Sequence, residues 1–539
     1  MRRIASLLIL VFLFVLSVGC QSQDRSVGLT PTMTTQPDVE AIATSTLTKT
    51  PVDLPTRTPT HTAAEDCGVS SECLTPSLQP TSDILLTQEG PWLLGYSSQE
   101  FVAMNPDGKG LTYLDIPDLW SPQTYGLINR LPGIVSPQGW LVAFTGVDWE
   151  SFADLALTIL RLPSSKPVFT IPLLSQQAIA QIEEDAQAIG DMKYYPSILD
   201  ASLHWSPDGR TLAFIAAIDG SSYDLYIYDT QTSEVRRLTD KPKQEFILDW
   251  SLDGSWIVYM EADYPYISTT SAPGFGPMPN SLWAISTDGS VDTILYDIDM
   301  GREVILGWLS SDSFVVYNTL SPEFPPSDLR IVNVTSGKIS SVFPGEFANV
   351  ALDEVGGVIA LTIPPHYRSE WDYGSGLFLV NIGEKKPQQI KENFWGEVDW
   401  LREVDQFFAW LGPDMHAFKI DGEIVANFEG ESCPPYPSPD GQWLAFVAKE
   451  SCSSFFSRSS GVRFFNVEGE FQDDIAAEGA YSFLWQADSE GIYFTVRNKE
   501  AEFGDDDYFG ELMYVSVHDW RPVVIHSDPN AFFYAWVAP

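Results

Sequence analysis

The sequence predicts an all-β fold, a single closed β-propeller with eight or nine four-stranded blades. Three observations lead to this prediction. A hairpin with the wording LHWSPDGRTLAF at 203–214 returns several times along the chain. Each copy is followed by a third strand-like run, a polar turn and a fourth short strand, at a period of roughly forty to fifty residues. The two ends of the chain also look like complementary parts of one blade. Four-stranded units at this period are typical of a propeller.

The hairpin itself follows from local chemistry. Leu203 and Trp205 alternate with polar neighbours, as in a strand with one buried face. The segment Pro207-Asp208-Gly209 is a turn, because Pro fixes its φ angle, Asp bonds to nearby backbone and Gly tolerates a positive φ. Residues 211–214 are apolar and partly β-branched, which predicts the second strand. Packing and turn geometry thus account for Trp205 and Asp208 without a catalytic role.

The repeat is read from copies of this hairpin and of the strand that follows it. Hairpins occur at 135–144, 249–259 and 436–446, with looser copies at 307–317, 399–410 and 484–494 and the weakest at 351–361. Third strands are expected at 224–229, 281–286, 328–333, 376–381, 461–466 and 511–516. Together with 203–214 and the unit composed from the two ends of the chain, these segments give nine candidate units. Because one weak unit, at 348–391 or 397–428, is ambiguous, the sequence leaves eight or nine blades open.

The order and wording of these units resemble the TolB-like propeller repeats, over about residues 92–539. The resemblance rests on the W-S-P-D-G hairpin and the D-L-Y-like strand, seen here as WSPDG at 205–209 and DLY at 224–226. Several units lack the Asp or the Gly, so their turns are expected to differ. The resemblance implies a propeller but no single activity, since such blades occur in periplasmic scaffolds, in the non-catalytic halves of serine oligopeptidases and in lipoproteins.

The two ends predict how the ring closes. Residues 92–96, 100–108 and 111–116 read as the second, third and fourth strands of a blade that has no first strand. The chain finishes with FYAWVAP at 533–539, where Trp536 matches Trp205. We therefore expect the C-terminal strand to complete the N-terminal blade, which leaves no open sheet edge.

The N-terminal region predicts export and anchoring. Residues 1–20 have a basic start, an apolar core and small residues before Cys20, as in a signal peptide. Their end resembles a bacterial lipobox, with Ser17 where Leu is usual, and implies lipidation of Cys20. A secreted protein or an uncleaved anchor is the alternative. Residues 21–82 are rich in Ser, Thr and Pro and contain no aromatic residue, which predicts a disordered tether. The propeller domain follows at 83–539.

The remaining cysteines are Cys67, Cys73, Cys433 and Cys452. Their even number and the exported compartment predict two disulfides, Cys67–Cys73 at the end of the tether and Cys433–Cys452 beside one hairpin. A zinc site is the rival reading, but the spacing of a C-x-x-C motif with partner histidines is missing. The sequence thus places the protein in a bacterial cell envelope, lipid-anchored and facing outside the cytoplasm, without specifying which membrane holds the anchor.

Charge and motifs exclude several function classes. The formal net charge is −43, with 73 acidic and 30 basic residues, which argues against a nucleic-acid partner. There is no G-x-S-x-G elbow, no H-E-x-x-H motif and no phosphate-binding glycine loop. GDDDYFG at 504–510 lacks the spacing of a calcium loop and reads as a solvated acidic loop. We expect no catalytic residues, no metal and no cofactor, and a monomer.

One face of the predicted propeller is elaborated. Turns between strands one and two, or three and four, are short, whereas loops on the opposite side are long and aromatic, at 146–154, 262–280, 319–327, 363–375, 449–460 and 497–510. An insert at 175–200 joins that side, with a helix expected near 175–190, Ser175 as its N-cap and Gly190 as its stop. Long loops on a rigid scaffold are a usual place for binding. The predicted ligand-binding residues are Trp149, Tyr264, Tyr266, Phe275, His366, Tyr367, Arg368, Glu370, Trp371, Asp372, Tyr373, Phe503 and Tyr508.

Two function classes follow from this face. The leading one is a membrane-tethered, non-catalytic module that binds a protein, peptide or glycan. The alternative is a glycan hydrolase or lyase built on the propeller, which needs a pair of facing carboxyl groups. Acidic residues are too numerous for such a pair to be chosen from the sequence. The ligand itself is not specified by the sequence.

Overall fold

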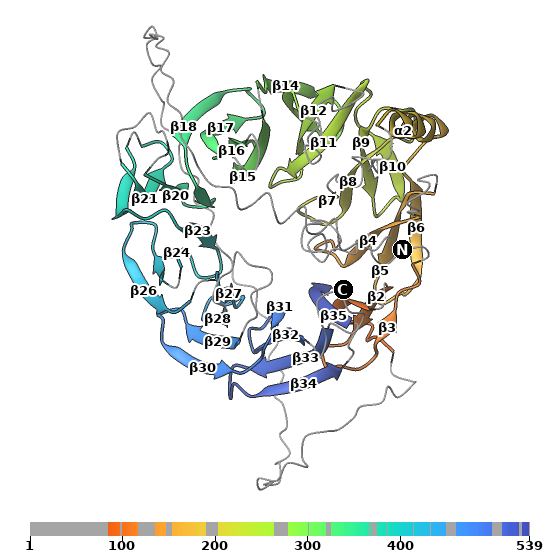
Figure 1. The fold of residues 1–539 in the computed structure, drawn as a ribbon. Helices are drawn as coiled ribbons and strands as arrows, with labels where there is room; N and C mark the ends of the chain where they lie inside the picture. Colours follow the sequence, from red (N-terminus) through yellow and green to blue (C-terminus); the bar gives the residue numbers. More distant parts are fainter. Residues whose placement is uncertain are drawn as a thin grey trace. The chain divides into compact units, whose positions relative to one another are not determined.

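The computed structural model describes residues 85–537 with gaps at 98–99, 117–134, 147–153, 190–202, 264–278, 300, 320–324, 366, 368–373, 385, 413, 432, 449–459, 498–508 and 528–530. The described residues form nine antiparallel sheets, which follow one another as blades around a common axis (Figure 1). Eight of these sheets have four strands and one has three. The predicted all-β propeller is confirmed, and the number of blades is nine.

The blades are numbered in ring order, and their strands are given from the axis outwards. Blade 1 contains β35 (Ala531–Val537), β1 (Trp92–Ser97), β2 (Glu100–Met104) and β3 (Thr112–Tyr113). Blade 2 contains β4 (Trp140–Thr145), β5 (Ala156–Arg161) and β6 (Pro167–Pro172). Blade 3 contains β7 (His204–Trp205), β8 (Thr211–Ala216), β9 (Asp224–Asp229) and β10 (Glu234–Arg237).

Blades 4 to 6 come next in the ring. Blade 4 contains β11 (Lys243–Trp250), β12 (Trp256–Asp263), β13 (Ser281–Ser286) and β14 (Asp292–Asp297). Blade 5 contains β15 (Arg302–Ser310), β16 (Ser313–Thr319), β17 (Ser327–Asn333) and β18 (Ile339–Glu346). Blade 6 contains β19 (Asn349–Asp353), β20 (Val358–Ile363), β21 (Gly376–Asn381) and β22 (Gln388–Glu392).

Blades 7 to 9 complete the ring. Blade 7 contains β23 (Glu397–Leu401), β24 (Gln406–Leu411), β25 (Asp414–Phe418) and β26 (Ile424–Glu429). Blade 8 contains β27 (Tyr436–Pro437), β28 (Trp443–Ala448), β29 (Gly461–Asn466) and β30 (Phe471–Ile475). Blade 9 contains β31 (Tyr481–Trp485), β32 (Gly491–Arg497), β33 (Phe509–Ser516) and β34 (Pro522–Ser527).

Blade 1 closes the ring as predicted. Strand β35, from the C-terminal end of the chain, pairs antiparallel with β1, and Leu93 lies opposite Trp536. Phe533 and Val537 of β35 are almost completely buried. The innermost position of the blade is therefore filled by the far end of the chain, and β1 has a paired strand on each side instead of forming the edge of the sheet.

Blade 2 has three strands among the described residues. Its sheet contains β4, β5 and β6, and the expected first strand, most of which falls in the segment 117–134 outside the described residues, contributes the bridge between Val135 and Leu141. The turn that follows is still formed, because Ser136 Oγ accepts hydrogen bonds from the backbone of Gln138 and Trp140, at 3.1 Å and 3.0 Å.

The repeated hairpin turns are held by one Ser–Asp pattern. In blade 3, Ser206 Oγ donates to Asp208 Oδ1 at 2.6 Å, and Asp208 accepts from the backbone nitrogen of Arg210 at 3.1 Å. Ser251 with Asp253 and Ser438 with Asp440 repeat the contact at 2.9 Å and 2.6 Å. The Asp of the motif therefore shapes a turn, as the sequence predicts.

The two ambiguous units, at 348–391 and 397–428, are both complete blades. In blade 6, Asp353 Oδ1 accepts from the backbone nitrogens of Val355 and Gly356, both at 3.0 Å, and so replaces the Ser–Asp contact. In blade 7, Asp405 takes the positive φ, 56°, that a Gly supplies elsewhere. The turns differ where the motif is degenerate, and the strands form regardless.

The hydrophobic core lies between neighbouring blades. One cluster joins Val258 of β12 with Phe314 of β16, and another joins Leu329 of β17 with Phe378 of β21. Tryptophans at the ends of the innermost strands add hydrogen bonds between blades. Trp250 Nε1 donates to the carbonyl oxygen of His204 at 2.9 Å, which links blade 4 to blade 3.

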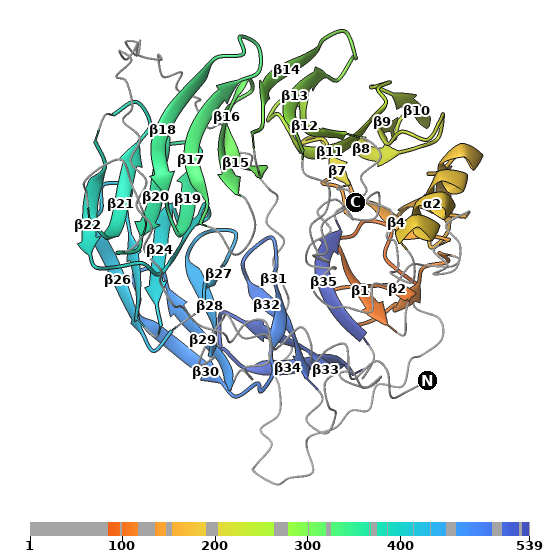
Figure 2. The same cartoon turned by 45° about the horizontal axis from the view of Figure 1, so that its top comes forward.

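The predicted helical insert is helix α2, Gln176–Ile189. Ser175 is its N-cap, because Ser175 Oγ accepts from the backbone nitrogen of Ala178 at 3.0 Å. Ala178 and Ile182 are buried in the cluster shared by blades 2 and 3, so α2 packs beside them (Figure 2). The helix ends at Ile189, and the expected stop Gly190 lies outside the described residues.

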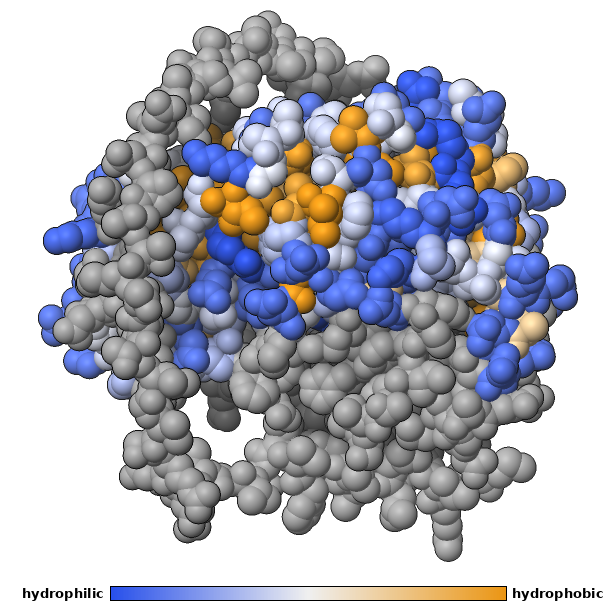
Figure 3. Space-filling model, turned by 90° about the horizontal axis from the view of Figure 1, so that it is seen from above, coloured by the Kyte–Doolittle hydropathy of each residue, from blue (hydrophilic) through white to orange (hydrophobic). Residues whose placement is uncertain are grey.

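The rim of the propeller is formed by the outermost strands. Figure 3 looks onto this rim on the side of β14 and β18 and shows apolar areas broken up by hydrophilic residues. Ile294 of β14 and Ile339 of β18 are among the exposed apolar residues. Scattered apolar residues of this kind are normal for a solvated edge.

Candidate functional site: the loop-bearing face

The strand bounds define two unlike faces. On the turn face, at residues such as 206–210, 251–255 and 287–291, the strands are joined by short turns. On the opposite side, β12 ends at Asp263 and β13 begins at Ser281, β28 and β29 are separated by 449–460, and β32 and β33 by 498–508. We call this side, with the connectors between blades, the loop-bearing face. Function is expected there, where long loops meet a rigid scaffold.

Most of the predicted ligand-binding residues lie outside the described residues. These are Trp149, Tyr264, Tyr266, Phe275, His366, Arg368, Glu370, Trp371, Asp372, Tyr373, Phe503 and Tyr508. Tyr367 is described. It is half-buried and packs against the cluster of Val315, Leu329 and Phe378 between blades 5 and 6. Its part in ligand binding therefore stays a prediction, beside a packing role that the structure shows.

The predicted cysteine pairs also remain predictions. Cys433 is 2% exposed and lies between β26 and β27. Cys20, Cys67, Cys73 and Cys452 are outside the described residues.

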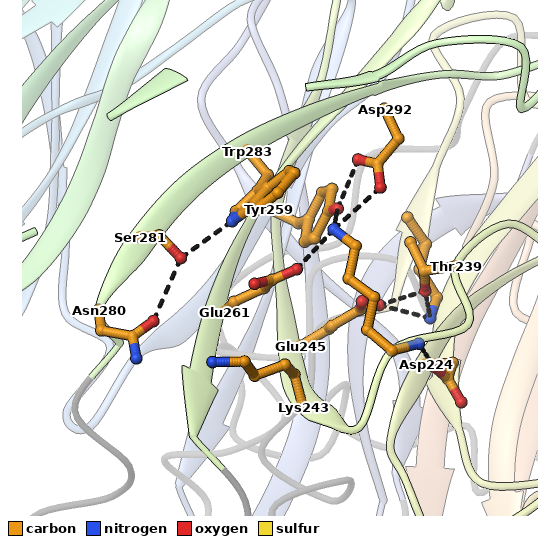
Figure 4. A network of polar contacts seen from close by, with 12 residues as sticks. Asp224, Thr239, Lys243, Glu245, Tyr259, Glu261, Asn280, Ser281, Trp283 and Asp292 are labelled. Atoms are coloured by element: carbon orange, nitrogen blue, oxygen red, sulfur yellow. Dashed lines mark hydrogen bonds and ion pairs between the residues drawn. The ribbon is translucent and has the colours of Figure 1, made fainter. Parts of the chain in front are cut away.

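A dense polar network lies between blades 3 and 4 and extends to the loop-bearing face (Figure 4). On that face it gathers the connector after β10, the start of β11, the end of β12 and the start of β13, and it reaches inward from that face to Asp292, the first residue of β14. Of these segments, the end of β12 and the start of β13 flank 264–278 in the sequence, the longest of the elaborated loops between strands. The network is therefore the described base of this part of the face.

Lys241, in the connector, is the cation at its centre. Its Nζ donates to Glu261 Oε1 at 2.6 Å and to the hydroxyl of Tyr259 at 2.8 Å, and lies 2.9 Å from Asp292 Oδ2. It also lies 3.4 Å from the centre of the Trp283 ring. The ammonium thus meets three oxygen acceptors and one aromatic face, a strongly favourable setting for a cation.

The residues around this ammonium are themselves held in place. The Tyr259 hydroxyl donates to Asp292 Oδ1 at 2.7 Å, and burial raises the pKa of Tyr259. Trp283 Nε1 donates to Ser281 Oγ at 2.9 Å, and Ser281 Oγ donates in turn to Asn280 Oδ1 at 3.2 Å. The indole orientation is therefore fixed from the start of β13.

Glu245 of β11 is the second centre of the network. It is 1% exposed, and its Oε2 accepts from the backbone nitrogen of Leu225 at 2.9 Å and contacts Thr239 Oγ1. Its Oε1 has no hydrogen-bond partner in the described part of the chain. Burial raises the pKa of Glu245 to about 8, and the nearby carboxylate of Asp224 acts in the same direction. At neutral pH Glu245 is therefore mostly protonated.

Asp224 ties the connector back to blade 3. Its Oδ1 accepts from the backbone nitrogen of Lys241 at 3.2 Å, and its Oδ2 accepts from Arg237 at 2.7 Å. Burial raises the pKa of Asp224, while Ser222, the Lys241 backbone and Arg237 oppose this shift. The network therefore spans both blades rather than one.

Two further blades carry a buried glutamate on the same face. In blade 5, Arg330 Nη2 donates to both oxygens of Glu303, at 2.7 Å and 2.9 Å. In blade 8, Arg463 Nη1 donates to Glu431 at 2.6 Å. The Glu303 and Glu431 side chains are 1% and 0% exposed, so these pairs hold strands together.

Sequence reasoning missed this network. A usable signal was present, since Glu245 precedes Trp250 and Glu303 precedes Trp308 by the same spacing in their blades. An acidic residue in an otherwise apolar first strand implies a buried partner. The partner Lys241, however, comes from another blade, and only the tertiary structure brings it near.

The described residues show neither a metal-binding cluster nor a membrane-spanning helix. Within them, no group of three or more His, Cys, Asp or Glu side chains is arranged to hold a metal ion. In the same part of the chain, no helix combines the length and apolar character needed to cross a membrane.

No protein-family model matches the chain. A stretch of 54 residues is 50% identical to a protein named uncharacterized peptidase YuxL, from Bacillus subtilis (strain 168). The match covers 10% of this chain and only 8% of that protein. What the whole of that protein does is therefore not transferred to this chain.

Solved structures with a similar arrangement share little sequence. A eukaryotic initiation factor gives a TM-score of 0.48 at 12% identity, over 83% of this chain and 98% of that one. Dipeptidyl peptidase 4 of Porphyromonas gingivalis gives 0.43 at 12%, over 74% and 59%. TolB of Acinetobacter baumannii gives 0.27 at 13%, over 60% and 74%. At this level the similarity carries no information on function.

Proposed function

We propose that this chain is a membrane-tethered, extracytoplasmic β-propeller of the TolB-like kind, which binds a protein, peptide or glycan through its loop-bearing face without catalysing a reaction. The observation that carries the proposal is the contrast between the two faces. Turns on one face are near their minimum length and are built for structure, whereas long loops rich in aromatic residues collect on the other. Aromatic and Arg side chains are favoured at binding surfaces.

The base of this face supports a rigid platform. Glu261 is buried, and its ion pair with Lys241 fixes the end of β12 on one side of the loop 264–278. Asn280 and Ser281 fix the start of β13 on the other side. Binding loops gain affinity when their attachment points are held still, because less order has to be created on binding.

The alternative of a glycan hydrolase or lyase needs two carboxyl groups that a substrate can reach. Glu245 and Glu261 lie directly opposite each other on β11 and β12. Both are buried, at 1% and 3% exposure, and both are engaged by protein groups. This pair therefore supports a structural role, and binding is the better account of the face.

A glycan array and a pull-down from envelope extract test the proposal together. We expect a specific ligand in one of them, and incubation of that ligand with the protein should leave it chemically unchanged. Cleavage of a glycan into products with new reducing or unsaturated ends would favour the enzyme instead.

The membrane tether is tested separately. Cys20→Ser should move the exported protein from the membrane fraction to the soluble fraction, because lipidation needs the thiol. Unchanged retention in membranes would mean that the apolar segment at 1–20 is itself the anchor.

A further inference from the structure

The cation between blades 3 and 4 differs from those in blades 5 and 8. Arg330 and Arg463 sit in the third strand of their blades, each directly after a fully buried apolar residue, Leu329 or Val462. In blade 4 the matching residue, after the fully buried Leu282, is Trp283. The positive charge there is supplied by Lys241 from the connector instead. Blade 4 thus has an aromatic ring where blades 5 and 8 have arginine.

The surroundings of Lys241 Nζ match a primary ammonium group. Such a group has three N–H donors, and three acceptors surround it: Glu261, Tyr259 and Asp292. The Trp283 ring covers it from another side at 3.4 Å. A planar guanidinium presents its donors in a rigid fork and would not meet these acceptors in the same way.

The acidic side chains around Lys241 Nζ outnumber the ammonium that they contact, which favours the binding of a cation there. Glu261 and Asp292 contribute two carboxylates, and Lys241 contributes one ammonium. The Glu261 side chain is only 4% exposed, and the Lys241 ammonium is the cation that it contacts. Lys243, two residues further along the chain, is paired with Asp263 at the exposed edge, where the Asp263 side chain is 76% exposed.

We propose that Trp283, Tyr259, Glu261 and Asp292 form a binding site for a primary alkylammonium group, which the chain fills with its own Lys241. The occupied site fastens the end of β12 and the start of β13 to the connector from blade 3. Asp224, at the start of β9, also holds the connector, because it accepts a hydrogen bond from the backbone nitrogen of Lys241. This inference concerns the described base of the face and does not depend on whether the face binds a ligand.

Chemical rescue in the full chain tests the site. Lys241→Ala removes three carbons and the ammonium, the size of n-propylammonium. We expect hydrogen exchange of the amides in Trp256–Asp263 and Ser281–Ser286 to rise by roughly tenfold or more in this variant, because buried Glu261 loses its partner. Added n-propylammonium chloride should return the exchange toward the wild-type rate.

The controls separate the site from general effects. Sodium chloride at equal ionic strength and n-propanol should give no rescue of Lys241→Ala. Lys243→Ala should raise exchange only slightly and should not respond to n-propylammonium, because Lys243 pairs at the exposed edge. Lys241→Met, with a chain of similar length and no charge, should behave like Lys241→Ala without the amine.

Three results would overturn the inference. One is rescue by sodium chloride or propanol that equals rescue by n-propylammonium. Another is equal rescue of Lys243→Ala. The third is wild-type exchange in Lys241→Met. If Lys241→Ala does not fold, the variant is refolded with and without n-propylammonium and the yield of folded protein is compared. A higher yield with n-propylammonium supports the site, and an equal yield counts against it.

Discussion

The indole nitrogen of Trp536, in the last strand of the chain, donates a hydrogen bond to the carbonyl oxygen of Trp485 in blade 9, at 2.8 Å. Trp485 makes the same kind of bond to the carbonyl oxygen of Tyr436 in blade 8, at 2.9 Å. The repeated tryptophan of the motif thus links each of these innermost strands to the blade before it. At Trp536 the link joins the two ends of the ring.

Removing the Trp536 link should weaken ring closure. Trp536→Phe keeps an aromatic ring but loses the indole hydrogen bond, so we expect the free energy of unfolding to fall by about 1 kcal/mol. Trp536→Ala also loses the ring contact with Tyr493 at 5.4 Å and should cost about 3 kcal/mol. Urea unfolding measures both, with Trp395→Phe as the control because Trp395 is 43% exposed. Equal midpoints for Trp536→Phe and Trp395→Phe would contradict this role.

Two glycines on the turn face form a matched pair. Gly441 and Gly337 have similar positive φ angles, 69° and 67°. A Cβ at 441 would lie 2.1 Å from the backbone oxygen of Glu403 in blade 7, whereas a Cβ at 337 would meet nothing. Gly337→Ala should cost about 1 kcal/mol through its φ alone. Gly441→Ala should cost roughly 2 kcal/mol more, because the neighbouring turn has to move. Similar melting temperatures for the two variants would show that the turns are not packed against one another.

Glu245 should make stability depend on pH. The pKa of its carboxyl group is raised from 4.5 to about 8 in the folded protein. Between these values the folded chain holds a proton that the unfolded chain releases. The stability contributed is full below about pH 4.5 and is lost as the pH rises through about 8. Glu245→Gln mimics the protonated form, so its unfolding free energy should fall less than that of the wild type between pH 5 and 8.

The difference in pH dependence between the wild type and Glu245→Gln reports on Glu245 alone. Asp224 and Glu431, whose pKa values burial also raises, are present in both. Urea unfolding at several pH values gives the two profiles. Parallel profiles would mean that Glu245 is not the group that takes up the proton.

Trp371 is the predicted anchor of the loop-bearing face. Trp371→Ala should weaken binding of an identified ligand by about 1–3 kcal/mol, as expected for an aromatic anchor at an interface. The melting temperature should change little, because a loop residue away from the core contributes little to stability. Titration calorimetry measures the affinity, and thermal unfolding of the same samples measures the melting temperature. A collapsed fold with unchanged affinity would make Trp371 a packing residue.

The architecture was predictable because its signals are local. The Ser–Asp turn, the flanking tryptophan and the apolar run after it lie within a dozen residues, and Trp536 repeats the pattern at the far end. In blade 2 the hairpin turn is intact, and the described part of its first strand contributes the Val135 bridge. Turn chemistry fixes the reversal of the chain.

The polar network of blades 3 and 4 was not predictable for the opposite reason. Lys241 looks like one more charged residue in a connector, and Trp283 like one more core aromatic. Their relation depends on the stacking of two blades, which places a connector against the face of the next sheet. Nothing in the spacing of 241 and 283 encodes a contact of 3.4 Å. Long-range pairs of this kind are set by tertiary packing.

The central claim, that the loop-bearing face binds and the turn face does not, is tested most directly by site-specific photocrosslinking in cells that produce the protein. A photoreactive residue replaces Trp371 or Tyr508, which are predicted to lie on the loop-bearing face, or Val355 or Leu252 on the turn face, which are 92% and 52% exposed. We predict a discrete crosslinked adduct from the first two positions and none from the last two. Adducts from Val355 and Leu252, with none from Trp371 and Tyr508, would contradict the account.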